Sequence, residues 1–84
     1  MHDVNPDLVA LKAAVRHLAA RIVQEAQATG QWAALAKNRG VPEVAVRLDM
    51  VVSSLEEALA SANEIPGLLF EAQELSNKEA HSHD

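Results

Sequence analysis

The chain has 84 residues, of which 49% are hydrophobic, a net charge of −5, no cysteine and two aromatic side chains, Trp32 and Phe70. This length accommodates one domain, and the lack of cysteine excludes disulfides and thiolate chemistry. No apolar stretch approaches the roughly 18 residues of a transmembrane span, and the first residues lack the basic-then-apolar order of a signal peptide. We therefore expect a cytoplasmic protein that does not bind membranes.

The first predicted helix covers residues 5–29. Asn5 is a favourable N-cap, Pro6 suits the first helical position, and Asp7 suits the positive end of the helix dipole. Gly30 can take the left-handed conformation that ends a helix. Apolar side chains recur every three or four residues and predict a stripe that faces a neighbouring helix: Leu8, Leu11, Val15, Leu18 and Ile22.

A short connecting helix is predicted for residues 31–39, with Gly40 as its end. We expect Trp32, Leu35 and Ala36 to point inward from it, because they share one face at helical spacing. Pro42 is tolerated only in a first turn, so the next helix begins there.

The second long helix is predicted for residues 42–63 and has the most regular pattern of the chain. Eight apolar residues alternate at spacings of three and four, which is the a and d pattern of a heptad repeat: Val41, Val44, Leu48, Val51, Leu55, Ala58, Ala62 and Ile65. Val52 and Leu59 form a second row beside this seam. Together the two rows are wide enough for a helix that is covered on more than one side.

Pro66 and Gly67 predict a break after Ile65 and a C-terminal helix over residues 66–78. The alternative is a kinked continuation of the long helix, because the heptad phase persists beyond the proline. Residues 79–84 lack bulky apolar side chains and are predicted to be a disordered tail.

Three bulky residues follow one another at Leu68, Leu69 and Phe70. Successive helical residues point in different directions, so one helix face cannot bury all three. We expect at least one of them to be exposed or to face a second partner.

No group of residues has the pattern of a catalytic or metal site. His17 has no possible ligand one turn away, and the paired carboxylates Glu56 and Glu57 lie off the apolar seam. The glycines are isolated and form no phosphate-binding loop. The sequence therefore predicts a protein that is not an enzyme and that uses no cofactor or metal.

Residues 32–47 resemble the helix-turn-helix of bacterial DNA-binding regulators. Small Ala36 precedes Gly40 by four residues, and apolar Val41 and Val46 follow. The resemblance implies a DNA-binding function with phosphate contacts from three basic residues: Lys37, Arg39 and Arg47. The segment departs from the pattern at Arg39, where an apolar residue is usual, and at Asp49, where the second helix turns inward.

These patterns predict an all-α fold, an antiparallel helical hairpin with a short connecting helix and a C-terminal helix, completed to a bundle by dimerisation. The predicted function is a non-catalytic interaction module, such as a small adaptor, a chaperone-like protein or a regulatory subunit. Its partner would be a second copy or another helical protein; a helix-turn-helix regulator is the alternative. The predicted partner-binding residues are Leu48, Val51, Val52, Leu55, Leu59, Ile65, Leu68, Leu69 and Phe70.

Overall fold

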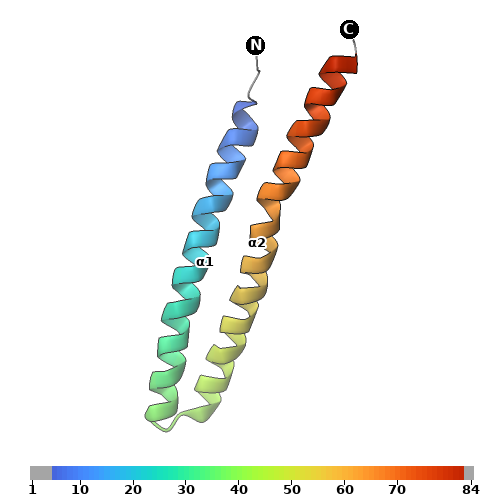
Figure 1. Ribbon diagram of the computed structural model, residues 1–84. Coiled ribbons are helices and arrows are strands. Elements are labelled where there is room, and N and C mark those ends of the chain that lie inside the picture. The colour runs from blue at the N-terminus through green and yellow to red at the C-terminus, as the bar shows by residue number, and fades with distance from the viewer. Residues whose placement is uncertain (1–4, 83–84) are drawn as a thin grey trace.

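The computed structural model describes the backbone of residues 5–82 and the side chains of residues 5–76. It contains two helices, α1 (Pro6–Asn38) and α2 (Pro42–Ser82). They run antiparallel and are joined by a tight turn, so that α1 begins near the end of α2 (Figure 1). The molecule is a slender rod with extents of 69 × 16 × 11 Å. The predicted all-α helical hairpin is confirmed.

Helix α1 begins where the sequence predicts. The Oδ1 atom of Asn5 accepts a hydrogen bond from the backbone N–H of Asp7 at 2.9 Å. The Asn5 carbonyl also accepts from the N–H groups of Leu8 and Val9, both at 3.1 Å. With Pro6 in the first turn and Asp7 at the positive end of the dipole, the first backbone donors are satisfied.

Helix α1 passes through Gly30 without interruption, so the predicted helices 5–29 and 31–39 are a single helix. A glycine inside a helix costs only about 1 kcal/mol relative to alanine. The positions that face α2 keep the same spacing on both sides of Gly30, and this continuous packing outweighs the cost. These positions include Ala26, Thr29, Ala33 and Ala36.

The C-terminus of α1 forms a Schellman motif. The N–H of Val41 donates to the carbonyl of Ala36 at 3.0 Å, and the N–H of Gly40 donates to the carbonyl of Lys37 at 3.2 Å. Gly40 has a φ of 78°, a left-handed conformation that residues with a Cβ rarely adopt. The chain reversal therefore depends on Gly40 and not on Gly30.

Helix α2 begins directly after this turn. The carbonyl of Val41 accepts hydrogen bonds from the N–H groups of Val44 and Ala45 at 3.1 and 3.2 Å. Pro42 lies in the first turn, where no helical hydrogen bond is lost, as predicted.

Helix α2 also continues through Pro66, so the predicted break and the separate helix 66–78 are not observed. Pro66 has no N–H to donate to the carbonyl of Ala62, and this costs about 3 kcal/mol. Continued contact with α1 compensates, because Leu69 and Gln73 beyond the proline are still half-buried. The backbone of residues 79–82 is helical, contrary to the predicted tail; residues 83–84 lie outside the described residues.

The contact between the helices is narrow and rich in alanine. The buried residues are Ile22, Ala33, Ala36, Ala45 and Ala62. Small side chains allow two helix backbones to approach closely, but they bury little apolar area each. The half-buried residues that complete the contact alternate at three and four: Leu8, Val15, Ala19, Ala26 and Thr29 in α1, and Leu48, Val52, Leu55, Leu59, Leu69 and Gln73 in α2.

The predicted seam of the second helix is rotated in the structure. Leu48, Leu55 and Ala62 face α1 as predicted, but Val44 and Val51 are exposed. Their places are taken by Val52 and Leu59, the predicted second row, together with Ala45. The apolar stripe of α2 consists of three adjacent rows of residues along the helix. Helix α1 covers the two rows that contain the small residues Ala45 and Ala62.

Helix α1 shows the same rotation. Leu8, Val15 and Ile22 face α2 as predicted, whereas Leu11 and Leu18 are exposed. Nearer the turn, Ala36 is buried but Trp32 and Leu35 are exposed, contrary to the prediction that all three point inward. Four of the five buried residues are alanines, and the leucines and valines of the contact are only half-buried.

Candidate functional site

The described residues contain no enclosed polar site. No cluster of three or more potential ligands could hold a metal ion there, and no polar or charged side chain is buried. None of the described helices combines the length and the apolar character needed to cross a membrane. The candidate site is therefore the surface of the hairpin itself.

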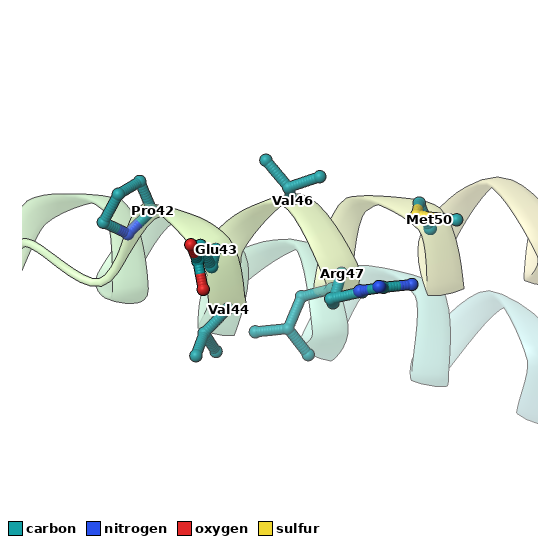
Figure 2. Close-up of a pocket in the computed structure, with 7 residues that line it drawn as sticks. Pro42, Glu43, Val44, Val46, Arg47 and Met50 are labelled. Atoms are coloured by element: carbon teal, nitrogen blue, oxygen red, sulfur yellow. The ribbon is translucent and has the colours of Figure 1, made fainter.

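The most prominent surface depression lies over the first turns of α2. Its lining comes from this helix alone: Pro42, Glu43, Val44, Val46, Arg47, Leu48 and Met50. Figure 2 shows Val44 and Val46 pointing to opposite sides of the helix, with Arg47 lying along it toward Met50. Because these side chains do not converge on one point, we do not interpret the depression as a ligand pocket.

One side of the hairpin is strongly apolar. On α1, four large side chains lie along one flank of the contact stripe: Leu11, Leu18, Trp32 and Leu35. On α2, five apolar side chains do the same: Val44, Val51, Ile65, Leu68 and Leu75. We call these nine residues the apolar face. All are exposed except Ile65, which is half-buried, and Trp32 retains 62% of its surface.

The two flanks lie on the same side of the hairpin, as contacts on the opposite side show. There, Val9 and Phe70 line one depression, and Arg16 and Asn63 line another. Leu11 follows Val9 by two residues, and Leu18 follows Arg16 by two. A step of two residues turns a helix by roughly half a turn, so these side chains point to the other side of the contact stripe. Leu11 and Leu18 of α1 therefore lie on the same side as the apolar residues of α2.

The opposite side, which we call the mixed face, carries charges of opposite sign on its two helices. On α1 these are Arg16 and Lys37, and on α2 they are Asp49 and Glu56, all exposed. This arrangement matches the uneven charge of the sequence, which has six basic and four acidic residues before position 48 but one basic and eight acidic residues after it. The mixed face therefore carries exposed charges along both helices.

The structure divides the nine predicted partner-binding residues into three groups. Five of them lie in the contact with α1: Leu48, Val52, Leu55, Leu59 and Leu69. Three belong to the apolar face: Val51, Ile65 and Leu68. Phe70 is 66% exposed on the mixed face. Leu68 and Phe70 are thus both exposed, in agreement with the prediction that the run 68–70 cannot be buried by one helix contact.

Sequence reasoning missed the contribution of α1 to this surface. The sequence pattern places Leu11 and Leu18 on the inward stripe, and Trp32 and Leu35 on the inside of a separate short helix. The signal that identifies them is the second alternation at three and four in α1, which passes through Leu11, Leu18, Trp32 and Leu35 and lies beside the alanine-rich alternation.

The segment that resembles a helix-turn-helix forms the tip of the hairpin. The helices on either side of Gly40 run antiparallel along their length (Figure 1). A helix-turn-helix instead joins its helices at about 90–120°. The basic residues of the segment, Lys37, Arg39 and Arg47, are exposed.

Comparisons with protein-family models, with curated proteins and with solved structures found no match to this chain.

Proposed function

We propose that this protein is a non-catalytic protein–protein interaction module whose apolar face binds another helical surface. The observation that supports the proposal is the exposure of eight large apolar side chains on one side of a two-helix rod. An extended apolar patch of this kind marks an interaction surface on most soluble proteins. Helices recognise such surfaces through side chains three, four and seven positions apart, and the residues of the apolar face recur at spacings of three, seven and fourteen.

The accessible surface of the chain supports this interpretation quantitatively. It amounts to 6903 Å². A compact monomer of 9.0 kDa exposes about 4,900 Å², so the hairpin exposes about 2,000 Å² more than its mass requires. A typical stable interface buries about 800 Å² on each partner. The excess therefore exceeds the area that one partner buries in a typical stable interface.

Two valine substitutions on α2 test this function. Val51 lies on the apolar face and Val46 does not, yet both are exposed, by 46% and 58%. Val51→Lys places a charge in the proposed interface, whereas Val46→Lys makes the same chemical change outside it. Sedimentation velocity of the full chain between about 5 and about 200 µM measures association at the concentrations where such interfaces form.

We expect the wild-type chain and Val46→Lys to associate alike and Val51→Lys to remain monomeric. Circular dichroism of both variants serves as the control for folding, since an exposed lysine on a helix changes its stability little. If the wild-type chain associates and Val51→Lys associates as strongly as Val46→Lys, the apolar face is not the surface through which it associates.

A DNA-binding function receives no comparable support from the geometry of residues 32–47. The antiparallel helices leave no separate recognition helix that could enter a major groove without its neighbour. We therefore keep the interaction module as the proposed function.

A further inference from the structure

Helix α1 carries a second heptad-like seam that its contact with α2 does not use. Starting at Asp7, residues on one flank alternate strictly at spacings of four and three up to the C-cap residue Arg39. All are exposed except the half-buried Ala28. The members are Asp7, Leu11, Ala14, Leu18, Arg21, Glu25, Ala28, Trp32, Leu35 and Arg39.

This second seam is complementary to itself when it is read in the opposite direction. In an antiparallel pair of identical α1 helices centred on Val23, Arg21 of one copy lies opposite Glu25 of the other. Asp7 then lies opposite Arg39. Each of these ion pairs occurs twice, because a two-fold axis makes every contact reciprocal.

The apolar positions match in size in the same register. Trp32, the largest side chain of the seam, lies opposite Ala14 of the second copy, and Leu18 lies opposite Ala28. Leu11 lies opposite Leu35. Large side chains facing small ones allow the two helices to interdigitate without voids. No other register of the two seams places both basic residues opposite acidic ones.

Helix α2 fits the same two-fold arrangement. Within the hairpin, Leu8 shares a depression with Gln73, and Ala19 shares one with Ala62. These pairs show that α2 residues near position 58 lie at the same height along the rod as Val23 of α1. The row of α2 residues that flanks the contact on this side is symmetric about the same level: Val44, Val51, Ala58, Ile65 and Ala72. Val51 then lies opposite Ile65 of the second copy, and Val44 opposite Ala72.

The geometry points to a second copy of this chain as the partner of the apolar face. Two hairpins stack face to face with α1 against α1 and α2 against α2, and reciprocal Arg21–Glu25 and Asp7–Arg39 ion pairs define the register. The result is an antiparallel four-helix bundle in which the turn of one hairpin lies beside the chain ends of the other. This inference rests on the proposed function, since it identifies the partner of the same surface.

The other face-to-face arrangement has different neighbours. If the two-fold axis ran along the rod, α1 would lie against α2 of the second copy. Glu25 would then lie level with a stretch of α2 between Arg47 and Lys78 that has no basic residue, so it would have no partner of opposite charge. The charges at positions 21 and 25 therefore distinguish the two arrangements.

Two complementary charge variants test the inference. Arg21→Glu places glutamate at both positions 21 and 25, and Glu25→Arg places arginine at both. Each homodimer then brings like charges together twice, whereas a mixed dimer of the two variants restores both ion pairs. Arg16→Glu, on the mixed face of the same helix, is the matched control for the change in net charge. The association of each chain, and of the equimolar mixture with one variant labelled, is measured by sedimentation of the full-length proteins.

We expect each charge variant to dimerise at least tenfold more weakly than the wild type and Arg16→Glu. We expect the mixture to recover wild-type affinity as a heterodimer. Recovery in the mixture cannot come from the Arg21–Glu25 interaction within one helix, because each variant chain keeps its own like charges. Circular dichroism confirms that both variants remain helical.

Three results would overturn the inference. The first is a wild-type chain that stays monomeric at about 200 µM. The second is charge variants that dimerise as the wild type does, and the third is a mixture that gains no affinity. If Val51→Lys abolishes association in the same series while the charge variants do not affect it, the apolar face is an interaction surface and only the register is refuted. If the wild type associates and Val51→Lys also has no effect, the proposed function fails as well.

Discussion

Replacing each of the three glycines by alanine makes the same chemical change in three backbone environments, and the structure predicts opposite signs. Gly30 and Gly67 lie inside helices, and a Cβ at either position meets no atom within 4 Å. Alanine there removes unfolded-state entropy at no steric cost, which stabilises the hairpin by about 1 kcal/mol. Gly40 has a φ of 78°, so Gly40→Ala forces a left-handed alanine and destabilises by about 1 kcal/mol.

Thermal unfolding followed by circular dichroism at one fixed protein concentration measures these changes. For a domain of this size, 1 kcal/mol corresponds to a shift in Tm of about 4–8 °C. Gly30→Ala and Gly67→Ala should each raise the Tm, and Gly40→Ala should lower it by a similar amount. None of the three glycines belongs to the apolar face, so association is not expected to change. If Gly40→Ala were neutral or Gly30→Ala destabilising, the assignment of the turn to Gly40 would be incorrect.

Three further substitutions test the packing and the helix ends. Ala33 is 5% exposed, so Ala33→Leu should lower the free energy of unfolding in urea by about 1–3 kcal/mol. Ala34→Leu, on the outside of the same helix, should be nearly neutral. Equal effects would contradict the narrow contact. Asn5→Ala should cost about 1 kcal/mol through loss of the N-cap, and hydrogen exchange should accelerate only in the first turn of α1. Pro66→Ala should stabilise by up to about 3 kcal/mol, and the new amide at position 66 should be protected from hydrogen exchange. An unchanged Tm would contradict a continuous helix there.

The sequence predicts the helices and the turn well where local chemistry decides. Asn5, Pro6 and Asp7 mark the beginning of α1, and Gly40 and Pro42 mark the reversal, because capping and φ restrictions act within a few residues. The predicted boundaries at Gly30 and Pro66 do not occur. Both are local preferences of a few kcal/mol, and the packing of one long helix against another outweighs them over many turns.

The orientation of the helices was harder to predict than their existence. Each helix has three adjacent apolar rows, and periodicity alone does not show which two rows form the contact. The structure buries Ala33 and exposes Leu11, so in α1 the alanine-rich row identifies the inward side. In α2 the same rule does not apply, because the exposed row contains Ala58 and the contact contains Leu48.

The exposure of Trp32 gives spectroscopic measurements of this protein a particular meaning. It is the only tryptophan, and the chain has no tyrosine. Because its indole lies outside the contact between α1 and α2, intrinsic fluorescence reports on the apolar face, whereas circular dichroism reports on the helices. Unfolding changes the surroundings of an indole that is already solvated only slightly, so the fluorescence of the isolated hairpin should change little when its helices unfold. A blue shift at constant helix content would instead indicate that another molecule has covered this face.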